Sequence, residues 1–289
     1  MRSTTVFERS SRLKKTIMQL AFGQEPCANP PETDDQTPLR ADLFSDSQME
    51  QHGKWLATQH QLAQSKQPDR LLKRLDDNEI IIFETCTLLT STITAKRRIA
   101  PAGEWLLDNY YLIEEQIRTA KKHLPKGYSQ ELPRLASGAS CHLPRVYDIA
   151  LEAISHGDGR VDVETLDRYI MAYQSVTPLM LGELWAIPIM LRLALIENLR
   201  RVGVRVMTAR THLNQAQNWA NRMMEVAESD PKSLILVIAD MARSRPPMVS
   251  SFVAELARQL KGHGPSLALP LTWIEQRLAE ANQTIEQMV

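Results

Sequence analysis

Hydrophobic residues recur at three- and four-residue steps from Asp69 onward, which is the spacing of an amphipathic helix. The sequence predicts a first helix from about residue 69 to the basic triplet Lys96–Arg98, whose charges favour a helix C-terminus. Its inward face is predicted to carry Leu71, Leu72, Leu75, Ile80, Ile82, Phe83, Cys86, Leu89 and Ile93.

A second helix is predicted from Pro101 to about Lys122, because proline is favoured in the first turn of a helix. The connection between the two helices is short, so we expect an antiparallel pair. The residues predicted to face inward are Trp105, Leu106, Leu112, Ile113 and Ile117.

The remaining pattern is also helical. Prolines and glycines make residues 124–144 an irregular excursion, and low glycine and aromatic contents favour helix over sheet. We therefore predict an all-α fold, an irregular multi-helix bundle interrupted by that excursion. Further helices are expected at about 145–155, 162–174, 179–201, 204–228, 231–243, 246–261 and 270–287.

The N-terminal part has a different composition. Residues 1–22 form a short basic amphipathic segment, which we interpret as a loosely docked terminal helix or an interfacial one. Residues 23–68 are predicted to be a mobile, acidic, proline-rich linker and lead-in, because few apolar groups there can offset chain entropy. Residues 69–289 form the predicted helical module.

Charge and hydropathy narrow the function classes. The chain has 34 Lys and Arg against 34 Asp and Glu, and its pI is about 7.1. This balance argues against a nucleic-acid-binding protein, which would carry a basic excess. No apolar run reaches the roughly 20 residues needed to cross a bilayer, so no membrane span is predicted.

The common catalytic motifs are absent from the sequence. It contains no Gly-x-Ser-x-Gly elbow, no Walker phosphate loop, no Gly-x-Gly-x-x-Gly and no His-Glu-x-x-His. No Asp-x-Asp pair is present to hold the metal of a sugar nucleotide. The sequence therefore predicts no catalytic residue, cofactor or metal ligand for this chain.

One polar constellation remains a candidate enzyme site. It would combine His156, Asp158 and Arg160 of a glycine-containing loop with Glu183. The competing interpretation is structural: the loop is a helix-to-helix turn with Asp162 capping the next helix. Glu183, Arg192 and Glu197 are then interior ionic groups, paired in a network with Arg145, Arg160 or Arg168.

Four sequence blocks, in this order, resemble the N-terminal region of cyclic β-1,2-glucan synthases. The resemblance covers about residues 69–289 and does not extend to residues 1–68. The blocks are Gly103–Arg118, Leu124–Leu135, Leu143–Arg160 and Thr177–Arg200.

The resemblance implies a parent protein of the inner membrane of Gram-negative bacteria, which transfers glucose from UDP-glucose with the help of a divalent metal. It implies a place on the cytoplasmic side, at the inner-membrane face, and a partner in the downstream glycosyltransferase region. None of the parent's catalytic motifs falls within these 289 residues, so the module resembles one truncated at its C-terminus.

Three functions are compatible with these observations. The leading hypothesis is a non-catalytic module that acts in docking or regulation. The first alternative is a module that guides β-1,2-glucan over Trp105, Tyr110, Tyr111 or Tyr128, since aromatic rings stack on sugars. The second alternative is an enzyme built on the composite site around His156 and Asp158.

Overall fold

A computed structural model describes residues 42–63, 70–124, 127–157, 159–262, 265–280 and 283–285. The basic segment predicted at residues 1–22 and the linker residues 23–41 lie outside the described residues, as does Asp158.

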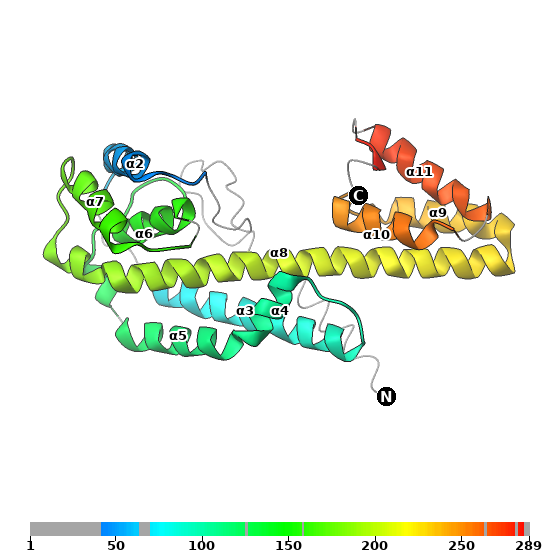
Figure 1. Cartoon of the computed structure of the whole chain (residues 1–289), viewed down its shortest axis with the longest axis horizontal. Helices are drawn as coiled ribbons and strands as arrows, with labels where there is room; N and C mark the ends of the chain where they lie inside the picture. The colour runs from blue at the N-terminus through cyan, green and yellow to red at the C-terminus, as the bar shows by residue number, and fades with distance from the viewer. Residues whose placement is uncertain are drawn as a thin grey trace. The chain divides into compact units, whose positions relative to one another are not determined.

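The prediction of an all-α fold is confirmed (Figure 1). Within the described residues there is no strand, and β-type pairing is limited to isolated bridges such as that between Leu62 and Leu135. Short 3₁₀ segments lie at Tyr128–Glu131, Pro231–Ser233 and Pro265–Leu267. The α-helices are α2 (Asp46–Gln59), α3 (Leu71–Thr94), α4 (Pro101–Asp108), α5 (Tyr110–His123), α6 (Arg145–His156), α7 (Val163–Gln174), α8 (Leu181–Ser229), α9 (Leu234–Arg243), α10 (Ser250–Leu260) and α11 (Ala268–Ala279).

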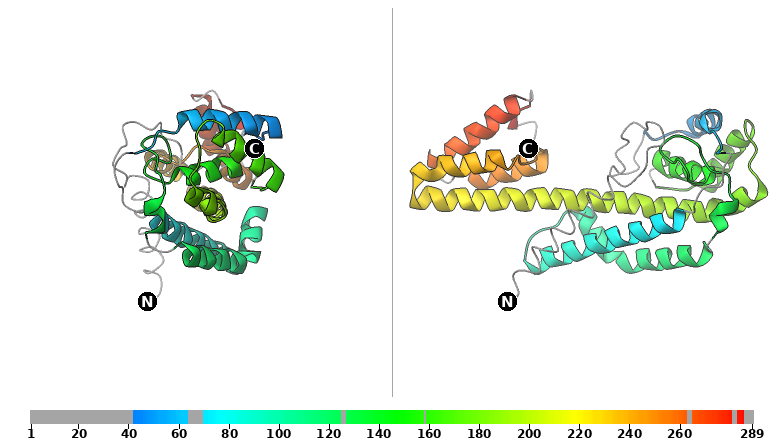
Figure 2. Two further views of the ribbon diagram at one scale, coloured as in Figure 1. Left: turned by 90° about the vertical axis from the view of Figure 1, so that its left-hand side faces the viewer. Right: turned by 180° about the vertical axis from the view of Figure 1, so that it is seen from behind.

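The chain divides into two compact units, Met1–Val204 and Arg205–Val289. In the first unit, α2, α6 and α7 lie on one side of the first part of α8, and α3, α4 and α5 lie on the other (Figures 1 and 2). The first group encloses a hydrophobic cluster of Met49, Leu56, Ala57, Ile149, Ala153, Tyr169, Ile170, Tyr173 and Leu179.

Helix α2 corrects the prediction of a mobile linker for residues 46–59. The helix begins after Ser45, whose backbone N–H donates to Oε1 of Gln48 at 2.8 Å. Met49, Gly53 and Leu56 are buried, and they share one face because they are three or four residues apart. Most of this face packs against α7.

The single helix predicted from Pro101 to Lys122 is interrupted at Asn109, so this prediction was wrong. Asn109 ends α4, and its Nδ2 donates to the carbonyl oxygen of Trp105 at 2.8 Å. Asparagine side chains compete in this way with the backbone bonds of a helix. The chain resumes as α5 at Tyr110.

Arg134 organises the described part of the irregular excursion, residues 127–144. Its guanidinium donates to the carbonyl oxygens of His142 and Ser129, each at 3.1 Å, and to the Ser129 hydroxyl. Arg134 is buried, and its guanidinium satisfies these acceptors beside backbone bonds such as that from the Leu135 N–H to the Leu143 carbonyl. The excursion is irregular, as predicted, and is held by this side chain together with backbone hydrogen bonds.

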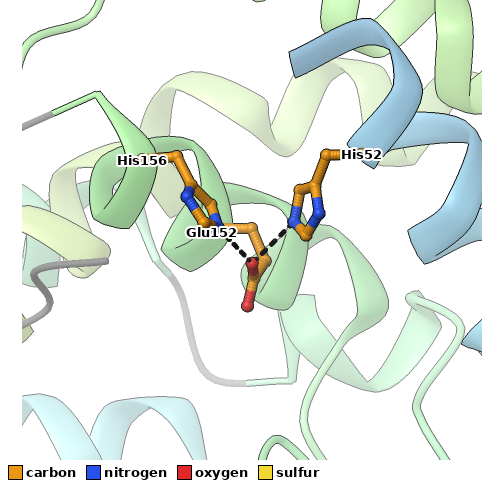
Figure 3. A group of neighbouring side chains, drawn as sticks. All are labelled: His52, Glu152 and His156. Carbon is orange, nitrogen blue, oxygen red and sulfur yellow. Dashed lines mark hydrogen bonds and ion pairs between the residues drawn. The ribbon is translucent and has the colours of Figure 1, made fainter. Parts of the chain in front are cut away.

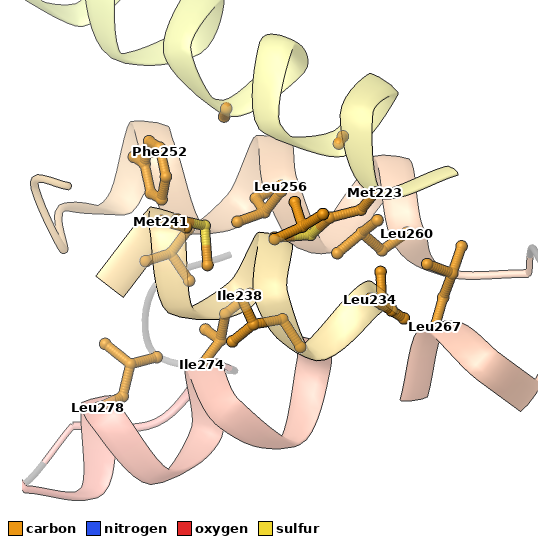
Figure 4. Packing of buried hydrophobic residues seen from close by; sticks show 14 residues of the cluster. Met223, Leu234, Ile238, Met241, Phe252, Leu256, Leu260, Leu267, Ile274 and Leu278 are labelled. Atoms are coloured by element: carbon orange, nitrogen blue, oxygen red, sulfur yellow. The ribbon is translucent and has the colours of Figure 1, made fainter. Parts of the chain in front are cut away.

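The second unit has its own hydrophobic core (Figure 4). It joins the residues of α8 beyond Arg205 to α9, α10 and α11. The buried residues are Ala216, Ala220, Met223, Leu234, Val237, Ile238, Met241, Phe252, Val253, Leu256, Leu260, Leu267, Ile274 and Leu278.

Helix α8 also differs from the prediction of two helices at 179–201 and 204–228. The structure has one continuous helix through Pro188 and Gly203. A Cβ atom at Gly203 would lie 3.2 Å from Oγ1 of Thr85, so the absent side chain allows α3 to approach closely.

Candidate functional site

A buried ion pair joins Arg145 of α6 to Glu183 of α8. Arg145 Nε donates to Oε1 of Glu183 at 2.6 Å, and its Nη2 donates to Oε2 at 2.7 Å. The side chains are 3% and 0% exposed. Glu183 Oε2 also accepts from the backbone N–H of Met180 at 2.9 Å, and Arg145 donates to the Pro178 carbonyl at 2.9 Å. The pair therefore fixes the turn that precedes α8 to the start of α6.

Glu197 forms a second interior ionic group further along α8. Its carboxylate accepts hydrogen bonds from Arg74 and Asn78 of α3, and from Arg200 and Arg201 one turn later on α8. Burial raises the pKa of Glu197, but the charges of the three arginines outweigh burial and hold this pKa well below its usual range. Glu197 is thus an anion that fastens α3 to α8.

His60 links the end of α2 to two other helices. Its Nδ1 lies 2.8 Å from the hydroxyl of Tyr173 on α7, and its Nε2 lies 3.0 Å from Oδ2 of Asp148 on α6. The side chain is only 5% exposed. Both ring nitrogens are occupied by protein partners, so the arrangement is suited to holding α2 in place.

A further cluster brings together His52 of α2 with Glu152 and His156 of α6 (Figure 3). Oε2 of Glu152 lies 2.7 Å from Nε2 of His52 and 3.4 Å from Nε2 of His156. The two residues from α6 are four positions apart and therefore point to the same side of that helix. This group of two imidazoles and one carboxylate has the residue types of a metal site.

The composite site predicted around His156, Asp158, Arg160 and Glu183 is not assembled in this form. His156 contacts His52 and Glu152, whereas Glu183 contacts Arg145. Arg160 is exposed, and Asp158 lies outside the described residues. The structural interpretation fits better, since Asp162 caps α7 by accepting from the Thr165 N–H at 2.9 Å and Gly159 has a positive φ of 73°.

The predicted glucan-contact residues lie on α4, on α5 and just beyond α5. Trp105 is 52% exposed and Tyr111 is 71% exposed. Tyr110 and Tyr128 are half-buried. Desolvation raises the pKa of Tyr110, with smaller contributions from the neighbouring Glu114, Cys86 and Glu79. Only Trp105 and Tyr111 thus present most of a ring to solvent.

Several residues predicted to face inward are exposed instead. The prediction was wrong for Ile80, Phe83 and Ile93 on α3, and for Trp105 and Leu112 on α4 and α5. In contrast Leu106, Ile113 and Ile117 are buried as expected. The helices α3, α4 and α5 contact one another, so these exposed side chains belong to one helical layer. We call the set Ile80, Phe83, Ile93, Trp105, Tyr111 and Leu112 the apolar surface of this layer.

The site residues that sequence reasoning missed are His52, His60 and Glu152. One signal was available for Glu152, which lies on the helix predicted at 145–155 and stands four residues before His156, predicted to begin the following loop. His52 and His60 lay in a segment predicted to be a linker.

In the part of the chain that the structure describes, no helix is long and apolar enough to cross a membrane.

Comparison with known proteins confirms the resemblance. The chain is 28% identical over 220 residues to the cyclic β-(1,2)-glucan synthase NdvB of Rhizobium meliloti strain 1021. The match covers 76% of this chain and 8% of the relative, so the chain spans a small part of that protein's length. No protein-family model matches the chain.

Proposed function

We propose that this chain is a non-catalytic helical module of a protein related to cyclic β-1,2-glucan synthase, and that it acts by docking against another region of such a protein. The observation that carries the proposal is the similarity to a 220-residue region of NdvB. On this proposal the module lies at the cytoplasmic face of the inner membrane, and UDP-glucose and a catalytic metal bind to the partner region.

The ionic groups of the first unit support a structural role. Glu183 and Glu197 are buried and bonded to arginines, and each joins two segments of the fold. The arginines hold the pKa of Glu197 well below its usual range, which makes it a poor proton donor or acceptor, and the oxygens of Glu183 are occupied by protein donors. These groups are therefore better suited to holding helices together than to chemistry on a substrate.

The apolar surface on α3, α4 and α5 supports docking. Large apolar side chains left exposed on neighbouring helices can take part in an interface, and Trp and Tyr are enriched among the residues that contribute most to binding energy. Trp105, Phe83 and Tyr111 are each more than half exposed. We favour a further region of a glucan synthase as the partner, because NdvB contains much sequence beyond the part that is similar to this chain.

Binding to NdvB lacking its similar 220-residue region tests the docking proposal. We expect the purified chain to bind this protein in detergent, and Phe83→Asp and Trp105→Asp to weaken binding because each places a charge in the interface. Val163→Asp is the matched control, since Val163 is also an exposed apolar residue but lies on α7. Absence of binding, or equal loss in all three variants with unchanged circular dichroism, would contradict docking by this surface.

Glucan binding is the second candidate function, favoured by the exposure of Trp105 and Tyr111. An exposed ring can stack on the apolar face of a sugar. Titration with linear β-1,2-glucans, followed by the indole and aromatic NMR signals, tests it. Shifts that disappear in Tyr111→Ala support this function, and a spectrum unchanged by glucan removes it.

The proposal also predicts that the purified chain alone does not transfer glucose from UDP-glucose. A radiolabelled transfer assay with added divalent metal checks this. Product that is formed by the wild type and lost in Glu152→Gln would refute a non-catalytic role.

A further inference from the structure

The hydrogen bonding of His156 indicates which of its ring nitrogens can bind a metal ion. Its Nδ1 lies 2.8 Å from the carbonyl oxygen of Asp42, which can only accept a hydrogen bond, so Nδ1 carries a proton. In a neutral ring Nε2 is then unprotonated, and it faces Oε2 of Glu152 at 3.4 Å. The Nε2 lone pair, which a metal ligand requires, therefore lies beside a carboxylate oxygen that can bind the same ion.

His52 adds a second imidazole to the same oxygen. Its Nε2 lies 2.7 Å from Oε2 of Glu152, and the ligand atoms of all three residues lie within 4.8 Å of one another (Figure 3). Phe44 stacks on His156 with ring centroids 3.7 Å apart and an angle of 11° between the planes. Stacking on Phe44 thus holds the His156 ring in orientation without help from a bound ion.

We propose that His52, Glu152 and His156 bind a divalent transition-metal ion of the zinc class. Two imidazoles and a carboxylate suit Zn²⁺, Co²⁺ or Ni²⁺, whereas Mg²⁺ and Ca²⁺ prefer oxygen ligands alone. Bonds of about 2.0–2.1 Å place tetrahedral ligand atoms about 3.4 Å apart. Glu152 is 32% exposed, so its side chain can rotate to make these distances equal.

The Asp42 carbonyl has the role of an outer partner in this site. A metal-bound histidine usually donates its other N–H to a carbonyl or carboxylate, which fixes the tautomer. The hydrogen bond from His156 Nδ1 to Asp42 is already of this kind. Three protein ligands leave a fourth position, which water reaches from the exposed side of Glu152.

The ion would join α2 to α6 through residues 100 positions apart in the sequence. It would therefore act as a clamp on the docking of α2, a role separate from the docking of the module itself. Ligand that binds the native state alone stabilises that state, so the metal should slow hydrogen exchange in α2.

Calorimetric titration of the full chain with ZnCl₂ in a non-chelating buffer tests the proposal. We expect one saturable site, an affinity lowered more than about ten-fold in Glu152→Gln and in His52→Gln, and no heat from MgCl₂. The matched control is His123→Gln, because His123 is an exposed histidine on α5 away from the cluster. Binding that is absent, or undiminished in both ligand variants, overturns the site.

A second measurement covers the case in which a ligand variant unfolds. X-ray absorption of the wild-type zinc complex should show two imidazole nitrogens and oxygen ligands, and Co²⁺ should give the visible absorption of a tetrahedral site. Zinc should also slow amide exchange of α2 in wild type. A thiolate shell, an octahedral all-oxygen shell or unchanged α2 exchange would refute the assignment.

Discussion

The backbone at Gly53 approaches Tyr169 so closely that a Cβ atom on Gly53 would lie 2.8 Å from the Tyr169 carbonyl oxygen and 3.0 Å from its Cδ2. Real Cβ atoms do not reach such distances to backbone, so α2 and α7 can pack this way only with glycine at residue 53. The contact explains why a glycine is tolerated in the middle of a helix, where it normally destabilises.

Gly53→Ala is therefore expected to destabilise the first unit by about 1–3 kcal/mol, because overpacking outweighs the better helix propensity of alanine. Urea denaturation and the exchange rate of α2 amides measure the effect. The control is Gly182→Ala on α8, where a Cβ would meet nothing within 4 Å. That variant should be neutral or slightly stabilising, and equal effects of the two substitutions would contradict the argument.

Glu183→Gln is expected to lower the free energy of unfolding by about 3–5 kcal/mol, because it leaves the buried Arg145 cation without its counter-charge. Urea denaturation followed by circular dichroism measures the loss. Glu164→Gln, at an exposed position on α7, should change stability by less than about 0.5 kcal/mol.

The double variant Arg145→Met/Glu183→Leu separates the two parts of this cost. Replacing both charges by apolar groups removes the uncompensated cation, so the double variant should be more stable than Glu183→Gln. If the double variant is less stable than Glu183→Gln, the ion pair contributes net stability beyond the avoidance of an unpaired charge.

Glu255 gives the second unit an acid-sensitive contact. Burial raises its pKa, but hydrogen bonds from Arg258, Gln259 and Gln217 outweigh burial and lower the pKa to about 2 from an ordinary 4.5. The stability that the folded carboxylate contributes is complete above pH 4.5 and is lost as pH falls toward 2. We expect a loss of about 2 kcal/mol over this range, reduced because Arg258 is largely exposed and solvent screens the pair.

Amide exchange of α10 against pH measures this loss. Glu255→Gln should flatten the dependence between pH 4.5 and 2, since the substituted amide does not titrate. Glu275→Gln, on an exposed position of α11, should leave the wild-type dependence intact. A slope that survives in Glu255→Gln would assign the acid sensitivity to another group.

Ile274→Ala tests how α11 is attached to the second unit. Ile274 is fully buried in the cluster, so removal of its side chain should cost about 2–5 kcal/mol through lost burial and a cavity. Thermal denaturation measures it. Leu269→Ala on the same helix removes a half-exposed side chain and should cost much less; a similar cost for both would mean that α11 is not held by this face.

The sequence was informative where a signal is local. Asp162 caps α7 as its position before an apolar run predicts, and the conclusion that Glu183 and Glu197 are interior ion-pair partners holds. Both inferences depend on a residue and its immediate neighbours. Arg145, one of three partners considered with Arg160 and Arg168, pairs with Glu183, whereas Arg74, the partner of Glu197 on α3, depended on the tertiary fold.

Helix α2 was missed because its buried apolar face is small and is flanked by polar residues. Met49, Gly53 and Leu56 are buried, but His52 beside them and His60 just after the helix count as polar in a hydropathy pattern. Their burial is made favourable by partners on α6 and α7. The proposed metal site was missed because it combines one ligand from α2 with two from α6, and these segments are about 100 residues apart in the sequence.

Periodicity alone also does not tell a buried helix face from an exposed apolar one. Ile80 and Phe83 are three residues apart and share one face of α3, yet that face is exposed, whereas Leu75 and Ile82 are buried. Either face minimises contact between apolar groups and water once its partner is present. The spacing of apolar residues predicts that they share one face of a helix, and only the structure shows whether that face is buried within the fold.

The contacts of α2 have a consequence for synthesis. Its side-chain partners follow it by about a hundred residues, as in the 100-residue separation of His52 and Glu152. At a translation rate of about 5–20 residues per second, the ribosome needs on the order of 10 s to make them. During that interval α2 lacks its partners on α6 and α7, so it is accessible to chaperones and proteases before it can pack.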